Sequence, residues 1–312
     1  MSRIAIGHIN PDTDTVCSPI AYSWFLSEKL GLSTTPKIAG ALNKETLFVL
    51  KKFGIPTPEI LKNFTVNDEV VLLDTNNPEE LIEGIESAKL VEVVDHHKLV
   101  GGLHTSDPVK ITMKPIACTA TVVWQIMNDS KVLDLPKEIA GIMLCAILSD
   151  TLKFTSPTTT DEDKKAAEEL ADICGENVEE LSAQMFEAKS DLSGMTTKDI
   201  LTVDSKIFEM GDKKVKISVL ETTKPNNALT MKEDLAIEMS KMKLEDKVDH
   251  IFFFVIDILK SEASLLATSD DEKALAEKAF DKSFEGDFLI LPGVVSRKKQ
   301  IVPALEKVVV GN

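Results

Sequence analysis

Arginine is nearly absent from this chain: 33 of its 35 basic residues are lysine, and only Arg3 and Arg297 are arginine. The 51 acidic residues outnumber the basic ones, so the formal net charge is −16. A surface of this sign repels polyanions and disfavours non-specific binding to nucleic acid. With one tyrosine and two tryptophans, the chain also has few aromatic rings on which bases could stack. Because lysine is so common, the arginine at position 297 stands out.

Long apolar runs and paired cysteines are missing as well. No run reaches the roughly 18 apolar residues of a membrane-spanning helix. The apolar run near the N-terminus has too few residues for a signal peptide. The four cysteines have neither CxxC nor zinc-type spacing, which is typical of reduced thiols in the cytosol. We therefore expect a cytoplasmic protein with neither a membrane nor a nucleic-acid partner.

The most informative segment is Gly7–Thr15, GHINPDTDT. It follows a short apolar run, Ile4–Ile6, which predicts a buried strand, and it precedes a helical pattern over Val16–Leu30 with Thr13 or Thr15 as N-cap. Carboxylates attract hard divalent cations, and an added imidazole shifts the preference from Mg toward Mn, Fe, Co or Zn. The alternative is a capped turn with solvated aspartates and an incidental histidine. The candidate ligands here are His8, Asp12 and Asp14.

Further ligand-type side chains stand at the ends of apolar runs. Val70–Leu73 leads into Asp74, and Leu90–Val94 leads into Asp95, His96 and His97; Asp150 closes the helical run Ile142–Ser149. The carboxyl ends of parallel strands meet at one edge of a sheet, where ligands bind. Solvated loops explain one such strand end but not several, so the sequence favours a metal site at this edge.

Four motifs in this order carry a resemblance to a known family. They are GHINPDTDT at Gly7–Thr15, LDTN at Leu73–Asn76, DHH at Asp95–His97 and SRKKQ at Ser296–Gln300. The first three resemble the DHH phosphoesterase superfamily, and the last resembles its second DHH-associated domain. The combination is similar to the family II, manganese-dependent inorganic pyrophosphatases over essentially all 312 residues.

This resemblance implies a two-metal site with a hydroxide bridging the two ions. One metal would be bound by His8, Asp12 and Asp74, and the second by Asp14, Asp74, His96 and Asp150, with Asp74 bridging. It implies two tight Mn²⁺ ions, with Co²⁺ as a possible substitute, and Mg²⁺ entering with the substrate. Asp95 would orient a neighbouring imidazole. His97 would face the substrate as a donor or proton source, although a purely orienting role stays open.

The resemblance also assigns the substrate-binding side chains. Pyrophosphate would be bound by Ser296, Arg297 and Lys298, together with Lys206, whose assignment depends on the resemblance alone. His97, Asp95, Arg297 and Lys298 are the predicted catalytic residues, and Lys299 is interpreted as a solvated lysine. The resemblance further implies a homodimer.

The length of the chain favours two α/β domains. We expect a metal-binding domain over residues 1–188 with a mainly parallel sheet and flanking helices. A linker or hinge at 189–195 would lead to a smaller α/β substrate domain at 196–312, with the active site in the cleft between them. In the first domain the pattern predicts a helix beginning at Pro78 and a loop over Gly101–Lys114.

The predicted function is hydrolysis of inorganic pyrophosphate to two phosphates. One alternative is another DHH phosphoesterase, either an exopolyphosphatase or a phosphodiesterase for short oligonucleotides or cyclic dinucleotides. The Gly-Gly-Gly-His motif of the nuclease-type domain is absent, which disfavours that alternative. The second is a non-enzymatic phosphate- or metal-binding protein, which the full ligand set argues against.

Overall fold

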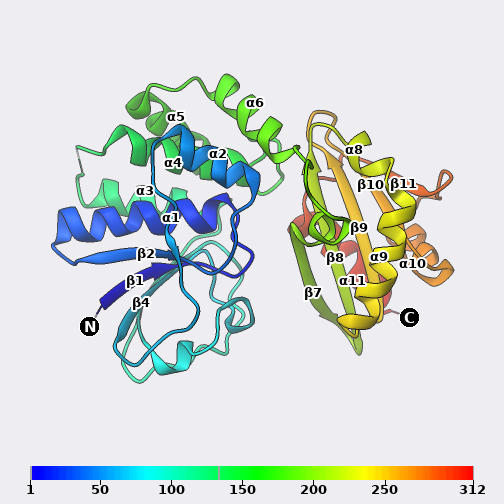
Figure 1. Cartoon of the computed structure of the whole chain (residues 1–312), viewed down its shortest axis with the longest axis horizontal. Coiled ribbons are helices and arrows are strands. Elements are labelled where there is room, and N and C mark those ends of the chain that lie inside the picture. Colours follow the sequence, from blue (N-terminus) through cyan, green and yellow to red (C-terminus); the bar gives the residue numbers. More distant parts are fainter. Residues whose placement is uncertain (1, 133, 312) are drawn as a thin grey trace. The chain divides into compact units, whose positions relative to one another are not determined.

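The chain folds into two compact α/β units, Met1–Ala188 and Lys189–Asn312 (Figure 1). The computed structural model describes residues 2–132 and 134–311. Among these residues, no helix combines the length and the apolar character needed to cross a membrane. The α/β class predicted from the sequence is confirmed.

The first unit is built on a parallel sheet with the strand order β3-β2-β1-β4-β5-β6. The chain order reverses between β1 and β4, and open α/β sheets bind ligands at the carboxyl ends of the strands at such a reversal. The strands are β1 (Ser2–Ile6), β2 (Thr34–Ile38), β3 (Glu59–Ile60), β4 (Asp68–Leu73), β5 (Lys89–Asp95) and β6 (Lys110–Met113).

Helices cover one face of this sheet in two layers (Figure 1). Helices α1 and α3 contact the strands, and α4 packs against α1, α3 and α5. Because helices surround α4, it is apolar almost all round, and eleven consecutive residues, Ile139–Ser149, are buried. The helices are α1 (Thr13–Trp24), α2 (Lys44–Lys52), α3 (Thr119–Asp129), α4 (Lys137–Asp150), α5 (Asp161–Cys174) and α6 (Val178–Lys189), and a π-helical turn, Phe25–Lys29, extends α1.

The connection from β4 to β5 contradicts the predicted helix at Pro78. Two single 3-10 turns, Pro78–Glu80 and Ile85–Ser87, replace it. Gly84 between them has a φ of 91°, in the left-handed region that interrupts a helix. Apolar side chains of this stretch, including Leu81, pack with Phe64 on the second face of the sheet.

Two further expectations for the first unit are wrong in detail. The loop predicted over Gly101–Lys114 contains the edge strand β6, which has only four residues, all exposed or partly exposed, and so gives too short an alternation to stand out. The first helix begins at Thr13, and its N-cap is Asp12 rather than a threonine, because Asp12 Oδ1 accepts from the backbone N–H of Thr15 at 2.8 Å.

The second unit has a mixed sheet in the order β11-β10-β9-β8-β7. Its predicted hairpin is confirmed, since β7 and β8 pair antiparallel; β8 and β9 pair parallel, and β9 is buried along its whole length. The strands are β7 (Asp204–Met210), β8 (Lys213–Thr222), β9 (His250–Asp257), β10 (Glu262–Ala267) and β11 (Phe288–Pro292).

Helices α7 and α9 pack on this second sheet around a core that includes Phe253 and Met239, while α10 packs on β9 and α11. The helix predicted to begin at Lys298 starts one residue earlier with a π-helical turn, Arg297–Ile301, capped by Ser296. The helices of this unit are α7 (Thr197–Thr202), α8 (Asn226–Leu229), α9 (Lys232–Glu245), α10 (Asp270–Phe280) and α11 (Val302–Val309).

Candidate metal centre

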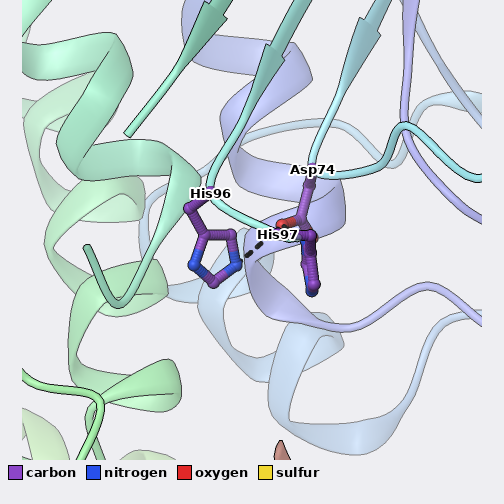
Figure 2. Close-up of side chains that lie close together, drawn as sticks. All are labelled: Asp74, His96 and His97. Atoms are coloured by element: carbon purple, nitrogen blue, oxygen red, sulfur yellow. Dashed lines mark ion pairs between the residues drawn. The ribbon is translucent and has the colours of Figure 1, made fainter. Parts of the chain in front are cut away.

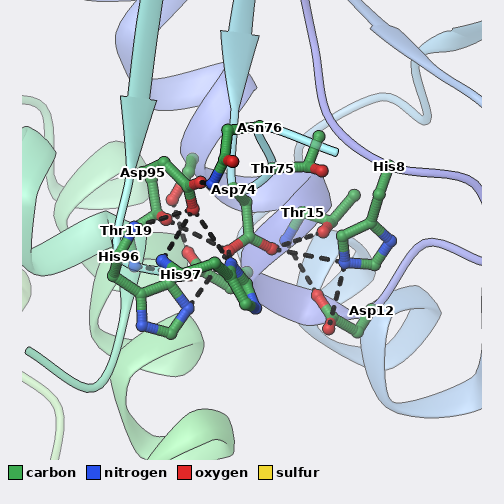
Figure 3. Close-up of polar contacts among 12 residues, drawn as sticks. His8, Asp12, Thr15, Asp74, Thr75, Asn76, Asp95, His96, His97 and Thr119 are labelled. Carbon is green, nitrogen blue, oxygen red and sulfur yellow. Dashed lines mark hydrogen bonds and ion pairs between the residues drawn. The ribbon is translucent and has the colours of Figure 1, made fainter. Parts of the chain in front are cut away.

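Three neighbouring strands of the first sheet, β1, β4 and β5, end beside one another. Figure 3 shows the side chains that follow them, with Asp74 at the centre of the group. The close approach of β1 to its neighbours requires Gly7, because a Cβ there would lie 2.7 Å from Thr15 Cγ2 and 2.9 Å from the carbonyl oxygen of Leu73. The edge of the sheet therefore gathers the side chains predicted to bind metal.

Asp74 is held in a left-handed backbone conformation with a φ of 63°. Its N–H still donates to the carbonyl of Val94 at 3.0 Å, which continues the β4–β5 ladder past the end of the strand. Aspartate tolerates this region of φ better than most residues. The turn leaves the carboxylate 1% exposed beneath the strand ends.

Both oxygens of Asp74 accept hydrogen bonds from hydroxyl groups. Thr15 Oγ1 donates to Oδ2 at 2.5 Å, and Thr119 Oγ1 donates to Oδ1 at 3.1 Å. These bonds leave the carboxylate facing two imidazoles from opposite sides, with Oδ2 3.5 Å from His8 Nε2 and Oδ1 3.3 Å from His96 Nε2. Figure 2 shows the approach of His96 to Asp74. One carboxylate is thus shared between two groups of potential ligands.

Each of these imidazoles is oriented through its other nitrogen. His8 Nδ1 lies 2.7 Å from the carbonyl oxygen of Ile9, and His96 Nδ1 lies 3.0 Å from that of Ile116. A carbonyl can only accept, so Nδ1 carries the proton in both rings. In the metal-free site, Nε2 therefore faces the carboxylates as a donor. A bound cation would displace that proton and be held through the Nε2 lone pair.

Asp14 and Asp150 complete the group from the helical layer. Asp14 is fully buried at the start of α1 and accepts from the N–H groups of Thr119 and Ala120, at 2.6 and 3.0 Å. These are N–H groups of the first turn of α3, so the helix dipole favours the charge. Asp150 ends α4. The carboxylates of Asp14 and Asp150 and the His96 imidazole offer ligand atoms within 4.8 Å of one another.

Burial and mutual repulsion act strongly on these acids. Burial, with the nearby charge of Asp74, raises the pKa of Asp14 to about 7. Burial and Asp14 raise the pKa of Asp150 well above its usual range. Burial opposes ionisation of Asp74 too, but hydrogen bonds from His8 and His96 hold its pKa well below the usual value. In the absence of cations, the group therefore retains protons that a bound cation would displace.

His8 and Asp12 face each other on the other side of the site. Burial alone would lower the pKa of His8, yet hydrogen bonds to Asp12 and Asp74 raise it well above its usual value. His8 Nε2 lies 3.6 Å from Asp12 Oδ2, while Asp12 Oδ1 caps α1. The two oxygens of Asp12 thus serve different purposes, one for the helix and one for the site.

The donor set fits divalent cations. His8, Asp12 and Asp74 form one group within 4.8 Å, and Asp14, His96 and Asp150 form another. Two ligands bound to one cation at about 2.1 Å and at right angles lie about 3 Å apart. The 3.3 to 3.6 Å between the imidazole nitrogens and their facing carboxylate oxygens is close to that spacing. Two imidazoles among carboxylates favour Mn or Co over Mg.

His97 lies beside the site and is oriented by Asp95. Asp95 Oδ1 accepts from His97 Nδ1 at 2.9 Å and from the backbone N–H groups of His96 and His97, while Asn76 Nδ2 donates to Oδ2 at 2.6 Å. Asp95 is fully buried. Burial lowers the pKa of His97, although Asp95 opposes this. Asp95 thus holds the His97 ring through Nδ1 and leaves Nε2 as the nitrogen without this contact.

Apart from His97 in the first unit, the residues predicted to bind substrate lie in the second unit, and part of the set is brought together there. Arg297 Nη1 donates to the Asp204 carboxylate at 2.7 Å and to its carbonyl at 3.2 Å. Lys206 follows Asp204 by two positions on β7 and therefore lies on the same face. Ser296 Oγ accepts from Lys299 N at 3.3 Å as a helix cap, and Lys298 and Lys299 are exposed.

Sequence reasoning missed several side chains that hold the site. The hydroxyl of Thr119 and the amide of Asn76 have no predicted role, and Thr15 is predicted only as a possible helix cap, although Thr15 and Asn76 belong to the quoted motifs. A helix pattern does not show which hydroxyl turns inward. No sequence pattern predicts the left-handed turn Leu152–Phe154 after Asp150, where three consecutive residues have φ of 47°, 52° and 67°. Backbone strain of this kind is often found beside functional sites.

Comparison with known families identifies both units. The DHH family N-terminal domain matches residues 3–147, and the DHHA2 domain matches residues 183–308. Fold and site together define a DHH-type protein with a DHHA2 domain.

Similar proteins show to which branch of the DHH family the chain belongs. The chain is 40% identical to the manganese-dependent inorganic pyrophosphatase of Bacillus subtilis, with 98% of each chain covered. It is also 40% identical to a probable manganese-dependent inorganic pyrophosphatase of Bacillus licheniformis over the full length of both. A solved Methanococcus jannaschii structure assigned to family II of the inorganic pyrophosphatases superposes with a TM-score of 0.85 at 36% identity, covering 98% of this chain and 99% of that one. This chain belongs to the family of manganese-dependent inorganic pyrophosphatases.

Proposed function

We propose that the protein hydrolyses inorganic pyrophosphate to two phosphates at a pair of Mn²⁺ ions bound by the first unit. His8, Asp12 and Asp74 would hold one ion, and Asp14, Asp74, His96 and Asp150 the other. The observation that carries this proposal is the position of Asp74, whose two oxygens face two separate ligand groups. A single shared carboxylate is what a two-metal site requires.

Two bound cations would lower the pKa of a water molecule between them and neutralise charge on the phosphates. The chain supports this chemistry by excluding water from Asp14 and Asp74, which are at most 1% exposed. The hydroxyls of Thr15 and Thr119 keep Asp74 oriented as charge in the site changes.

His97 is the proposed proton-handling residue. Because Asp95 accepts from its Nδ1, Nε2 is the atom at which His97 takes up or releases a proton. The neutral ring accepts there, and the Asp95 carboxylate would stabilise the ring once it is protonated. Asp95 therefore acts on the reaction through His97.

The phosphate charges need cations from the chain, which we assign to Arg297, Lys298 and Lys206 of the second unit. Asp204 engages Nη1 of Arg297 through both its carboxylate and its carbonyl oxygen. The guanidinium has five N–H groups in a rigid fork, so its other donors can bind phosphate oxygens in pairs. Asp204 would thus fix the direction of the fork.

Binding by both units would require them to close on the substrate, with a hinge within residues 189–195. Ser190 at the start of this segment is held to the second unit, because its Oγ accepts from Thr223 N at 2.7 Å. Small-angle scattering should show compaction when a non-hydrolysable pyrophosphate analogue binds. An unchanged radius of gyration with proven binding would reject the hinge. The homodimer stays a prediction, and sedimentation would test it.

A substrate panel tests the function directly. The purified protein is stripped of metal with a chelator and then reloaded with Mn²⁺. It should hydrolyse pyrophosphate far faster than tripolyphosphate or a dinucleotide. Its metal content should be two ions per chain. Preference for tripolyphosphate would favour an exopolyphosphatase, cleavage of the dinucleotide a phosphodiesterase, and no turnover at all a binding protein.

A further inference from the structure

A buried carboxylate lies behind the proposed metal centre, at the start of α2. Glu45 is 2% exposed, and α2 packs against α1 and α4, the helices that begin and end with proposed ligands. Burying a carboxylate is costly, and apolar replacements of similar size are often tolerated or stabilising. A position that served packing alone would favour an apolar residue.

The hydrogen bonds of Glu45 show what it connects. Its Oε2 accepts from Thr13 Oγ1 at 3.0 Å and from Ser149 Oγ at 2.8 Å. Thr13 stands between two proposed ligands on α1, and Ser149 directly precedes a third on α4. Thr13 has one hydroxyl hydrogen, which it donates to Glu45, so Thr46 Oγ1 at 3.1 Å donates to Thr13. Glu45 is thus a common acceptor for two ligand-bearing segments.

Capping of α2 does not account for this residue. The N-cap is Asn43, whose Oδ1 accepts from Thr46 N at 2.8 Å. A negative charge in the first turn suits the helix dipole, but a solvent-exposed position would serve that purpose without the cost of burial. The contacts to Thr13 and Ser149, in contrast, join two segments that carry proposed ligands.

We propose that Glu45 is a positioning residue for the metal centre. It ties the start of α1 to the end of α4 and so sets the separation of Asp12 and Asp14 from Asp150. Glu45 acts through Thr13 and Ser149 rather than on the ions themselves. The inference rests on the proposed two-metal site. It adds to that site a residue that is not itself a proposed metal ligand.

Two variants separate the shape of Glu45 from its charge. Glu45→Gln keeps an oxygen that can accept from the two hydroxyls but loses the charge, whereas Glu45→Leu keeps the volume and loses both. The matched control is Glu272→Gln in the second unit. Glu272 is likewise fully buried and accepts from Lys243, Thr268 and the backbone N–H of Ile251.

The measurement is Mn²⁺ affinity of the chelator-stripped protein by calorimetry, together with the thermal midpoint of the metal-free form. Removing residues that orient metal ligands typically weakens binding about 10- to 100-fold. We expect a loss in this range for Glu45→Leu and a smaller loss for Glu45→Gln. At saturating Mn²⁺, kcat should largely recover, with little change in KM for pyrophosphate. Glu272→Gln should lower the thermal midpoint and leave Mn²⁺ affinity unchanged.

Wild-type affinity for Mn²⁺ in Glu45→Leu would overturn the positioning role, as would a lowered thermal midpoint as the sole effect. If Glu45→Leu does not fold, Glu45→Gln decides, and unchanged Mn²⁺ binding in that variant rejects the inference. Failure of the wild-type protein to bind two Mn²⁺ ions would instead reject the proposed function, and the inference with it.

Discussion

The two units of this protein treat buried charge in different ways. In the second unit, acidic and basic side chains neutralise each other: Glu272 pairs with Lys243 at 2.8 Å, and Lys216 pairs with Asp246 at 2.6 Å. In the first unit, the buried acids Asp14 and Asp74 have hydroxyls, backbone amides and imidazoles as partners among the described residues.

The pKa values show the consequence of this difference. Burial opposes ionisation of Glu272, yet Lys243 and several hydrogen bonds lower its pKa. Burial and the charge of Asp74 raise the pKa of Asp14 to about 7. Glu272 is therefore neutralised within its own unit, whereas the acids of the metal centre need protons or external cations. The predictions below test this contrast.

The largest effect should follow from Asp74→Asn. Loss of the shared carboxylate should lower the affinity for both Mn²⁺ ions. It should also remove several kcal/mol of charge stabilisation from the transition state of the reaction. About 4 kcal/mol corresponds to about a 10³-fold loss of kcat, and metal analysis should find fewer than two ions.

The matched control for this variant is Asp257→Asn in the second unit, where a buried carboxylate accepts from the backbone N–H groups of Leu259 and Lys260. It should retain metal and activity. Two tightly bound Mn²⁺ ions in Asp74→Asn would exclude the bridging role.

The stability of the metal-free protein should fall as pH rises from about 4 to 8. Asp14 has a folded pKa of about 7 against 3.8 for the ordinary residue, so in this range the folded state binds more protons than the unfolded state, and stability declines with pH. The raised pKa of His8 acts in the same direction. At about 1.4 kcal/mol per pKa unit, Asp14 alone contributes up to about 4 kcal/mol.

Thermal unfolding across this range, with and without Mn²⁺, measures the effect. Bound Mn²⁺ should abolish the decline or reverse it, because the cations replace the lost protons. A metal-free protein that grows more stable between pH 4 and 8 would contradict the assigned repulsion between Asp14 and Asp74.

The choice of metal should also change the recovered activity strongly. Because His8 and His96 add imidazole nitrogens to the carboxylates, stripped protein should recover far more activity with Mn²⁺ or Co²⁺ than with Mg²⁺ alone. Recovery assays at matched free-ion concentrations measure this. Equal recovery with Mg²⁺ alone would show that the imidazoles do not determine the metal.

The smallest expected effect concerns the second unit. Arg297→Lys keeps the positive charge but loses the planar fork that Asp204 orients, and charge-assisted hydrogen bonds contribute about 1.5 to 3 kcal/mol. kcat/KM for pyrophosphate should therefore fall about 10- to 100-fold with metal content unchanged. Lys299→Arg, at an exposed position, is the control and should have little effect. A wild-type kcat/KM in Arg297→Lys would reduce Arg297 to one positive charge among several.

Much of this architecture follows from the sequence because it depends on local patterns. The apolar runs before Asp74 and Asp95 predict strands that end at ligand-type residues, and the hairpin of β7 and β8 follows from its alternation around Gly211. The errors arose where local signals compete with packing. The stretch after Pro78 has a helical composition, but its apolar residues cover the second face of the sheet in two short turns.

The sequence by itself determined which residue types could bind cations, the strands and helices that carry most of them, and the family resemblance that predicts their roles. Only the tertiary structure decided that Thr13 and Thr15 turn their hydroxyls to Glu45 and Asp74, which leaves Asp12 rather than a threonine to cap α1. It also decided that Asp204 holds Arg297. The reason is physical: a hydrogen bond between residues 32 or 59 positions apart depends on how helices and strands pack, and no local pattern encodes that distance.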